Sequence, residues 1–325
     1  MKALVTGGAG FIGSHIVERL LKEGNDVVVL DNFSSGKEEN LSFVSSYGQS
    51  AIDYRLIRGD ICDYDTCLRA CKGIEIIFHQ AALRSVPKSM NNPYEYNEVN
   101  INGTLNMLKA GGECGTKRLV FASSSSVYGD TDKFPEKETA YPLLISPYAL
   151  TKLAGEYYCR IFSENFGLET VSLRYFNVFG PRQALDDEYA VVIPKFIHCI
   201  LNNEQPPIFG NGKQSRDFTY IDNVVEANIL AATVPLRDTQ YAIRNTILNV
   251  ANGKDNTVLS IVDSLNKIIG KNIQPEFLPV RKGDVFKTLA DVSKIKSMLG
   301  FKPIVDFEQG LRRTVEYFKS QLVKG

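Results

Sequence analysis

The sequence has 325 residues, and its 37 lysines plus arginines balance its 37 aspartates plus glutamates, so the formal net charge at pH 7 is zero. This length favours one large or two medium domains with a full hydrophobic core. The balanced charge argues against binding to nucleic acid or to a membrane surface. No apolar run approaches the ~18 residues that a bilayer span requires. We therefore expect neither nucleic acid nor membrane as a partner, but a small molecule.

The cysteines and the N-terminus give an expectation about location. The first predicted strand begins at Lys2, which leaves no room for a secretory signal peptide, so we predict a cytoplasmic chain with reduced thiols. Cys62, Cys67 and Cys71 lie close together in sequence, but the chain has no paired CxxC and only three histidines. We therefore predict that there is no metal site.

The first half of the chain alternates short apolar runs with helical periods, which is typical of βαβ units around a parallel sheet. The runs lack strict alternation, as expected for strands that are covered on both faces. Strands are predicted at residues 3–5, 27–30, 74–78, 119–121 and 171–173. The sequence therefore predicts an α/β fold with a doubly wound parallel sheet in residues 1–175.

The second half is more irregular, because prolines and glycines divide it into short elements after Gly180 and Pro181. Helices are predicted at residues 223–232, 260–269, 293–299 and 307–322. We expect residues 176–325 to form a smaller α/β lobe that binds the substrate, with a segment near 220–235 returning to the first domain.

A glycine pattern near the N-terminus predicts a dinucleotide site. Gly7, Gly10 and Gly13 follow the first strand and open a helix. They permit a tight turn, close approach of a pyrophosphate to the backbone and tight packing of the helix on the strand. Asp31 ends the next strand, 18 positions after Gly13, where its carboxylate can accept hydrogen bonds from ribose hydroxyls. That carboxylate would repel a 2′-phosphate, so we predict NAD rather than NADP. Asp60, after a third strand, either binds the adenine amino group or caps the following helix.

Tyr148 and Lys152 form the candidate catalytic pair. They stand at i and i+4 on one predicted helix face, and Pro147 suits its first turn. Because a Tyr-x-x-x-Lys pair is expected about once by chance in this composition, its position carries the argument. Hydroxyls at residues 123–126 follow an apolar strand, at the sheet edge where ligands of open α/β sheets bind. A lysine ammonium and a cationic nicotinamide both favour the phenolate, so Tyr148 can remove a hydroxyl proton while hydride leaves the same carbon.

Eight segments in one order resemble the extended short-chain dehydrogenases and, within them, the nucleotide-sugar 4-epimerases. The segments are TGGAGFIG (6–13), DNFSSG (31–36), HQAA (79–82), SSSSVYG (123–129), YALTK (148–152), RYFNVFGPRQ (174–183), SRDFTYIDNV (215–224) and PVRKGDV (279–285). The resemblance covers nearly the whole chain. It implies a Rossmann domain that binds NAD, a UDP-sugar substrate and a homodimer.

The resemblance also implies residue roles. By position, Ser124, Tyr148 and Lys152 resemble the catalytic residues. The implied cofactor contacts are Gly7, Gly10, Phe11, Ile12, Gly13, Asp31, Asn32, Ser35, Gly36, Asp60, Ile61, Gln80, Ala81, Ala82, Tyr148 and Lys152. The implied substrate contacts are Ser85, Ser124, Ser125, Ser126, Asn177, Val192, Arg216, Arg281, Asp284 and Thr288. Within this set Asn177 resembles a contact to the diphosphate or the sugar, and Arg216 and Arg281 resemble a pair that grips the pyrophosphate. The alternative for Arg216 is a surface salt bridge with Asp217.

The implied reaction oxidises C4 of a UDP-sugar to a ketone, lets the ring turn, and returns hydride to the opposite face. Related dehydratases and decarboxylases typically carry acidic residues near the serine position. Residues 124–126 are all serine here, which favours epimerisation over those reactions. A nucleotide-sensing binding protein is the third alternative, but it would be expected to lack the tyrosine and lysine.

Thr288 is the basis for predicting the sugar. It occupies a position that resembles a gate, where a large aromatic residue restricts the pocket to simple hexoses and a small residue admits an N-acetyl group. HQAALRSVPKS (79–89) and the stretch FNVFGPRQ (176–183) followed by AVVIPKF (190–196) resemble the subgroup acting on N-acetylated hexosamines. We therefore predict interconversion of UDP-N-acetylglucosamine and UDP-N-acetylgalactosamine, with UDP-glucose and UDP-galactose as a second pair. UDP-uronates stay open because Arg84 and Lys88 are cations near the pocket, unless they are solvated loop charges.

The helix after Tyr148 carries more apolar residues than one packed face needs: Leu150, Leu153, Tyr157, Ile161 and Phe162. Dimers of the resembled family pair such helices in a four-helix bundle, so we expect a homodimer. The alternative is that the second lobe covers these side chains.

Overall fold

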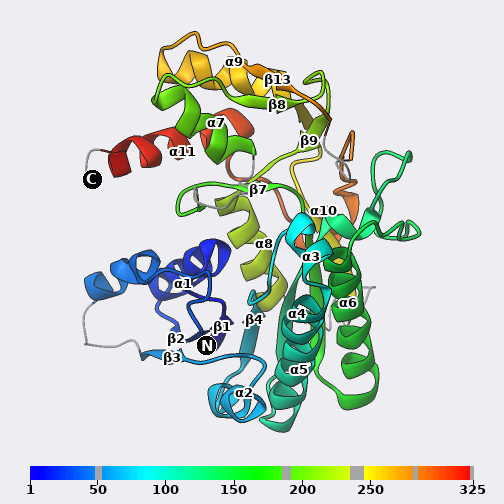
Figure 1. Cartoon of the computed structure of the whole chain (residues 1–325). Coiled ribbons are helices and arrows are strands. Elements are labelled where there is room, and N and C mark those ends of the chain that lie inside the picture. Colours follow the sequence, from blue (N-terminus) through cyan, green and yellow to red (C-terminus); the bar gives the residue numbers. More distant parts are fainter. Residues whose placement is uncertain (48–52, 185–191, 235–244, 281–284, 323–325) are drawn as a thin grey trace.

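The computed structural model describes residues 1–47, 53–184, 192–234, 245–280 and 285–322 (Figure 1). Two of the residues predicted to bind substrate, Arg281 and Asp284, lie outside these ranges.

A seven-stranded parallel sheet forms the centre of the molecule, in the order β11-β6-β5-β4-β1-β2-β3. From β3 to β6 this is the classic doubly wound order of dinucleotide-binding folds, so the predicted fold class is confirmed. The strands are β1 (Lys2–Thr6), β2 (Asp26–Asp31), β3 (Tyr54–Arg58), β4 (Ile76–His79), β5 (Arg118–Ser124), β6 (Glu169–Tyr175) and β11 (Thr246–Val250). The seventh strand, β11, comes from beyond residue 175 and was not predicted.

Helices cover both faces of this sheet, which explains the uninterrupted apolar strands. Within β1, Ala3 and Val5 join one core cluster and Leu4 joins the other, so successive side chains serve opposite faces. One face is covered by α1 (Phe11–Lys22), the 3₁₀ segment η1 (Glu38–Tyr47) and α8 (Ile221–Thr233). The other is covered by α2 (Tyr64–Cys71), α5 (Gly103–Glu113) and α6 (Pro147–Phe166). Helix α8 contains most of the segment that we expected to return to the sheet, and it contacts β5 and β6.

Shorter elements surround the carboxyl end of the sheet. Three helices and a parallel strand pair lie together beyond that end in Figure 1: α7 (Val192–Leu201), α9 (Val258–Ile269), α11 (Phe307–Leu322), β8 (Pro207–Phe209) and β13 (Glu276–Leu278). Two further strand pairs join β7 (Val178–Phe179) to β10 (Thr219–Tyr220) and β9 (Ser215–Asp217) to β12 (Asp255–Thr257). The remaining elements are α3 (Val86–Asn91), α4 (Pro93–Asn97), the π-helical turn η2 (Glu98–Asn102), the 3₁₀ turn η3 (Ser125–Tyr128) and α10 (Ser293–Leu299).

Helix α6 begins and ends where its local sequence requires. Pro147 occupies the first helical position, and the Ser146 side chain caps the helix by accepting a hydrogen bond from the Ala149 amide at 3.1 Å. Gly167 ends it in the left-handed conformation, with φ of 72°. The helix therefore presents Tyr148 in its first turn.

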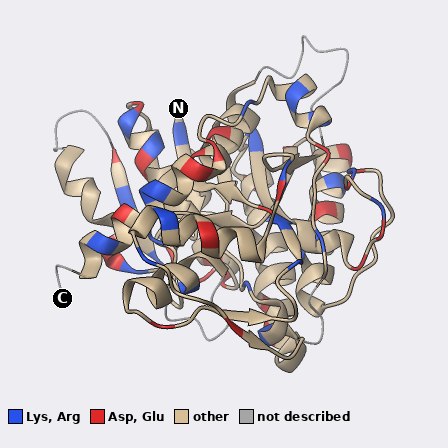
Figure 2. Cartoon of the chain, turned by 90° about the horizontal axis from the view of Figure 1, so that it is seen from above, with Lys and Arg blue, Asp and Glu red and all other residues tan. Residues whose placement is uncertain are grey.

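The described residues also bear on the expectations from composition. All six cysteines are free thiols and four of them are buried. In the part of the chain that the structure describes, no group of three or more histidine, cysteine or acidic side chains is arranged to hold a metal ion. Within the same ranges, no helix has both the length and the apolar composition needed to cross a membrane. Figure 2 shows acidic and basic residues interspersed along the ribbon.

Candidate active site

A cavity of about 2230 Å³ lies at the carboxyl ends of the sheet strands, and most of the predicted site residues line it. Two predicted residues stand behind the cavity wall instead, namely Gly13 and Lys152. The predicted residues that line it are Gly7, Gly10, Phe11, Ile12, Asp31, Asn32, Ser35, Gly36, Asp60, Ile61, Gln80, Ala81, Ala82, Ser85, Ser124, Ser125, Ser126, Tyr148, Asn177, Val192, Arg216 and Thr288. The structure thus brings the cofactor and substrate sets into one space.

The glycine turn between β1 and α1 has no room for side chains. Gly7 has φ of +65°, and a Cβ atom there would lie 2.8 Å from the Ala81 backbone nitrogen. A Cβ atom on Gly13 would lie 2.1 Å from the Gly7 carbonyl oxygen, which explains why Gly13 acts in packing rather than in lining the cavity. Gly10 caps α1 without any side-chain acceptor. The first amides of α1 therefore remain available to an anion, as a pyrophosphate site requires.

Asp31 is held rigidly at the end of β2. Its carboxylate accepts hydrogen bonds from the Ala9 amide at 2.9 Å and from the Phe33 amide at 2.8 Å. Burial raises the pKa of Asp31, and the two backbone hydrogen bonds lower it only in part. A Cβ atom on Gly36 would lie 2.9 Å from an Asp31 oxygen, so this glycine keeps the approach to the carboxylate open.

The structure decides one of the two alternatives for Asp60. The N-cap of α2 is Asp63, whose side chain accepts from the Asp65 amide, so the expectation that Asp60 caps that helix is wrong. Asp60 instead accepts hydrogen bonds from the Cys62 amide and the Asn32 side chain, each at 2.8 Å. Burial alone would raise the pKa of Asp60, but these hydrogen bonds bring it below its ordinary value. Contact with adenine stays a prediction.

An adenine dinucleotide fits the residues of this half of the cavity. The glycine turn and the open N-terminus of α1 match a pyrophosphate, and the Asp31 carboxylate lies at the end of the next strand, where a ribose would stand. The residues that would hold the adenosine end are therefore Gly10, Phe11, Asp31 and Gly36.

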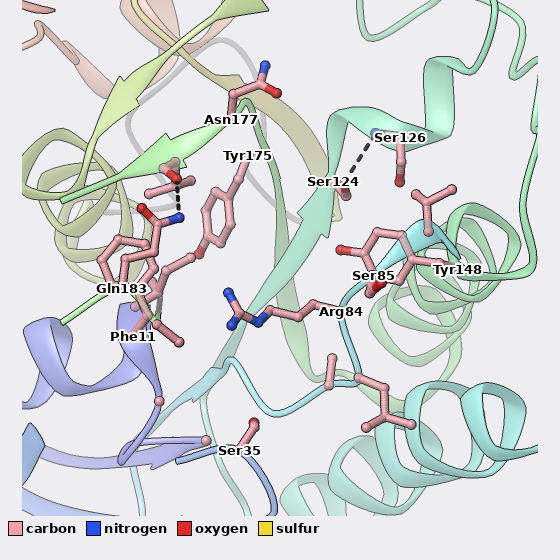
Figure 3. A pocket seen from close by; sticks show the side chains of 18 of the residues that line it. Phe11, Ser35, Arg84, Ser85, Ser124, Ser126, Tyr148, Tyr175, Asn177 and Gln183 are labelled. Atoms are coloured by element: carbon pink, nitrogen blue, oxygen red, sulfur yellow. Dashed lines mark hydrogen bonds between the residues drawn. The ribbon is translucent and has the colours of Figure 1, made fainter. Parts of the chain in front are cut away.

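Tyr148 and Ser124 lie together on the opposite side of the cavity from Phe11 (Figure 3). Burial raises the pKa of Tyr148, while a hydrogen bond with Ser124 and the charge of Arg84 lower it in part. The Ser89 hydroxyl accepts a hydrogen bond from the Tyr148 amide at 3.1 Å, and the Tyr96 ring packs edge-on at 6.4 Å between centroids. These contacts fix the phenol within reach of the serine.

Lys152 is buried one helical turn beyond Tyr148. Its ammonium donates a hydrogen bond to the Ala122 carbonyl at 2.8 Å and lies 6.0 Å from the centroid of the Tyr148 ring. Burial lowers the pKa of Lys152 to about 8. The ammonium is therefore anchored at the end of β5, and its effect on Tyr148 stays a prediction.

A buried ion pair holds α6 against the strands that end at the site. Glu156 accepts two hydrogen bonds from the Arg174 guanidinium, at 2.7 and 2.8 Å, and one from the Ser123 hydroxyl at 2.5 Å. Both charged side chains are almost fully buried. Removing one partner would leave an uncompensated charge, so this network fixes the position of Tyr148 relative to β5 and β6.

The serines after β5 present unused hydrogen-bonding capacity to the cavity. The Ser124 hydroxyl accepts from the Ser126 amide at 3.1 Å, drawn as a dashed line in Figure 3. The Ser126 hydroxyl is buried and has no hydrogen-bond partner among the residues that the structure describes. Because a buried polar group without a partner is costly, this hydroxyl points to a ligand.

Arg84 extends into the cavity from the loop after β4. In Figure 3 its guanidinium points toward the side of the cavity where Tyr175 and Phe11 lie. Lys88, the second cation considered with it, is exposed on α3 and is not part of the cavity wall. Of the two cations, only Arg84 is therefore placed to meet a bound anion.

Asn177 and Thr288 meet at the wall formed by the second half of the chain. Asn177 has φ of +35°, which is unusual for a residue other than glycine. Its amide nitrogen donates to the Asp217 carbonyl and to the Thr288 hydroxyl, each at 3.0 Å. Thr288 is only 8% exposed, so it forms a tightly packed part of the wall.

Arg216 lines the same wall from β9. Its guanidinium donates to the carbonyls of Ser215 and Phe286, at 2.9 and 3.0 Å. The carboxylate of Asp217 instead accepts from the amides of Asn252, Gly253 and Ala290. The two neighbouring side chains are thus engaged with different parts of the backbone, and Arg216 remains a cation at the cavity.

Sequence reasoning missed Gln183 and the role of Tyr175. Gln183 is 4% exposed, donates to the Val178 carbonyl at 3.0 Å and has a buried side-chain oxygen that finds no partner within the described part of the chain. The Tyr175 hydroxyl bonds with the side chains of Gln80 and Asn228 at 2.9–3.2 Å. Both residues fall in the conspicuous segment 174–183, but a linear pattern does not reveal that Asn228 on α8 completes the group.

Comparison with known proteins agrees with this geometry. Residues 3–251 match the NAD dependent epimerase/dehydratase family. A putative UDP-glucose 4-epimerase of Methanocaldococcus jannaschii is 36% identical over 319 residues, which cover 98% of each chain. The structure of a UDP-N-acetylglucosamine 4-epimerase from Methanobrevibacter ruminantium, in complex with UDP-N-acetylmuramic acid, is 42% identical with a TM-score of 0.90, covering 98% of each chain. A UDP-glucose 4-epimerase of Thermus thermophilus in complex with NAD is 35% identical with a TM-score of 0.86, covering 98% of this chain and 99% of that one. The chain belongs to the NAD-dependent epimerase/dehydratase family.

Proposed function

We propose that the protein is a UDP-sugar 4-epimerase whose preferred substrates are UDP-N-acetylglucosamine and UDP-N-acetylgalactosamine. The observation that carries the reaction class is the pairing of Tyr148 with Ser124 inside the cavity that also contains the glycine turn. A proton-transferring phenol therefore shares one space with a dinucleotide site.

The chain's own residues would handle the proton and the orientation of the sugar. When bound, NAD supplies an acceptor and donor of two electrons for the sugar C4. Tyr148 takes the proton of the 4-hydroxyl group and later returns it, while Ser124 holds the reacting oxygen through its hydroxyl. Lys152 keeps a positive charge beside the phenol from its anchor on Ala122.

Two features favour epimerisation over dehydration or decarboxylation. Residues 124–126 present hydroxyls and no carboxylate beside Tyr148. The cavity of about 2230 Å³ is shared by the cofactor and sugar residues, and we expect the sugar to turn within it while its nucleotide stays bound. Arg216 offers a guanidinium to the diphosphate, which would tether the nucleotide during that turn.

The choice of an N-acetylated sugar rests on Thr288. Its side chain is small, and its hydroxyl is engaged by Asn177 at 3.0 Å, so it forms a compact wall. A compact wall leaves room for a 2-N-acetyl group. UDP-glucose and UDP-galactose would also fit, and we expect them to be slower substrates.

A second candidate substrate is a UDP-uronate, and Arg84 is the observation that favours it. Its guanidinium points into the cavity and its charge acts on Tyr148. A carboxylate on the sugar would be attracted to this cation.

We also expect a cytoplasmic homodimer with the substrate lobe in residues 176–325. Leu150, Tyr157 and Ile161 are exposed on α6, at 51%, 57% and 45%, so the described second half does not cover them. Phe162, by contrast, is buried, with only 9% of its surface exposed. The three exposed side chains supply an apolar face that a second copy would bury.

The test is incubation of the purified protein, without added NAD, with UDP-N-acetylglucosamine, UDP-glucose and UDP-glucuronate in separate reactions. We expect UDP-N-acetylgalactosamine to form fastest, as seen by chromatography of the sugar nucleotides. Faster turnover of the uronate would transfer the substrate assignment to that candidate. Net formation of NADH, or loss of water or carbon dioxide from the sugar, would contradict the epimerase proposal.

A further inference from the structure

The segment of residues 286–290 carries Thr288 into the cavity, and its backbone is hydrogen-bonded along two edges. One edge is hydrogen-bonded to the backbone of β9, at 2.9–3.1 Å. The amides of Ser215 and Asp217 donate to the carbonyls of Phe286 and Thr288, respectively, and the Thr288 amide donates to the Ser215 carbonyl. On the other edge the backbone of Glu136 donates to Leu289 at 2.7 Å and accepts from Asp291 at 2.8 Å. The position of Thr288 in the wall of the sugar subsite therefore depends on the hydrogen bonds along these two edges.

Each edge also contributes one buried carboxylate. The Glu136 side chain accepts from the Leu289 amide at 3.0 Å, and the Asp217 side chain accepts from the Ala290 amide at 3.3 Å. Glu136 is 2% exposed and Asp217 is fully buried. Two carboxylates thus engage consecutive amides directly after Thr288.

We propose that Glu136 is a positioning residue for the sugar subsite: with Asp217 it fixes residues 286–290 from both edges, and thereby holds Thr288 against Asn177. This inference rests on the proposed function, because it assigns Thr288 to the wall that meets the sugar. It separates the two edges by role. The β9 edge carries Arg216, which we propose to meet the diphosphate and whose guanidinium also bonds to the Phe286 carbonyl. The Glu136 edge bonds instead to Leu289 and Asp291, on the other side of Thr288 from Phe286.

Glu136 and Asp217 together form a clamp on residues 286–290. The electrostatics of the two carboxylates make this clamp sensitive to pH. Burial raises the pKa of Glu136 to about 7; the Leu289 amide and Arg216 lower it and Asp217 raises it. Burial also raises the pKa of Asp217 to about 7, with three backbone amides lowering it and Asp255 raising it. When pH rises through this range, both carboxyls become charged and repel one another.

The other charged groups around the clamp are paired with one another on its outer side. Lys287 lies 3.1 Å from Asp255, and Lys137 lies 4.0 Å from Asp291. Glu138 accepts a hydrogen bond from the Asn249 amide at 2.9 Å. Glu136 and Asp217 are thus the two carboxyls whose side chains engage the backbone of residues 289 and 290 directly.

The test compares Glu136→Ala and Glu136→Gln in the NAD-loaded protein, with Lys137→Ala as the matched control. Lys137 lies on the same loop, but its side chain is 64% exposed, and within the described ranges its one ion pair is the long contact with Asp291. Calorimetry would measure the dissociation constants of UDP-N-acetylglucosamine and of UDP, which lacks the sugar. Steady-state kinetics would measure KM and kcat for the sugar nucleotide over roughly pH 6–8.

We expect Glu136→Ala to weaken UDP-N-acetylglucosamine by about fivefold or more and to leave UDP unchanged, with the loss in KM rather than kcat. Glu136→Gln keeps an oxygen for the Leu289 amide, so it should restore the affinity at pH 7. In the parent protein the sugar-dependent affinity should fall as pH rises through about 7, and in Glu136→Gln it should be flatter. Lys137→Ala should behave as the parent.

Equal weakening of UDP and the sugar nucleotide by Glu136→Ala would overturn the proposal, as would the parent's pH dependence persisting in Glu136→Gln. Should Glu136→Ala fail to fold, the Gln variant and its pH profile decide the matter alone. A parent protein that binds the sugar nucleotide without epimerising it would contradict the proposed function. The role of Glu136 would then be tested by the dissociation constants of UDP and the sugar nucleotide alone. A parent that shows no extra affinity for the sugar would overturn the clamp.

Discussion

The cofactor half and the sugar half of the cavity are built in opposite ways. Gly7, Asp31 and Asp60 come from the first sixty residues, on consecutive strand ends of a single βαβ run. Asn177, Arg216 and Thr288 come from three distant segments, and hydrogen bonds between those segments hold the wall together. Cofactor recognition is therefore set by local geometry, whereas sugar recognition depends on how remote parts of the chain pack.

This contrast predicts different responses to substitution. In the cofactor half the backbone itself approaches the ligand, so an added methyl group would clash with neighbouring backbone atoms. In the sugar half side chains form the wall, so a substitution should change which sugar fits before it changes the fold.

The largest effect is expected from Gly13→Ala. The new Cβ atom would lie 2.1 Å from the Gly7 carbonyl, so the turn or the helix must move. We expect a loss of about 1–3 kcal/mol or more in unfolding free energy and loss of retained NAD, measured by thermal unfolding and by the absorbance of released nucleotide. The matched control is Gly112→Ala in α5, where a Cβ atom meets nothing within 4 Å. A Gly13→Ala protein that keeps both its stability and its bound nucleotide would contradict the claim that the cofactor half has no room for a side chain.

Tyr148→Phe should leave the fold and the nucleotide intact but remove the proton-transferring hydroxyl. We expect turnover of the sugar nucleotide to fall by about 10²–10⁴-fold, with NAD content equal to the parent's. Rates would be measured by chromatography of the products. Turnover close to that of the parent would exclude Tyr148 as the base.

Thr288→Tyr should have the most selective effect. Thr288 is only 8% exposed, so a larger side chain there would extend into the space for the sugar. We therefore expect loss of N-acetylhexosamine turnover by about tenfold or more and much less change for UDP-glucose. Thr288→Ser, which keeps the hydroxyl that Asn177 engages, should retain both activities. Unchanged N-acetylhexosamine turnover in Thr288→Tyr would refute the gate.

The sequence predicts the fold well wherever the signal is local. The helix predicted at 293–299 has the same bounds as α10, and the glycine turn and Pro147 place α1 and α6 correctly. Strand β11 was missed because its five residues resemble many short apolar runs in the second half. Its place beside β6 depends on contacts with β6, α8 and α10 that no local pattern contains.

In the candidate site, too, the residues in recognisable motifs were predicted, and those that depend on long-range contacts were missed. Most of the residues that the resemblance and the spacing of motifs predicted do line the cavity, including Asn177 and Arg216 from the remote segments. Glu136 escaped notice because it stands in a stretch of charged residues and proline, a composition that predicts an exposed loop. It is buried because the amide of Leu289, more than 150 residues away, supplies the hydrogen bond that a buried carboxylate needs.

The central claim is that the hydrogen on the sugar C4 leaves and returns inside the one cavity that the cofactor and sugar residues share, without exchanging with water. Epimerisation of UDP-N-acetylglucosamine in heavy water, followed by mass spectrometry of the purified product, tests it directly. We predict a product with no deuterium bound to carbon, because only the hydroxyl proton passes through Tyr148. Deuterium at C4 would mean that the carbon is deprotonated and reprotonated from solvent, and it would contradict the mechanism.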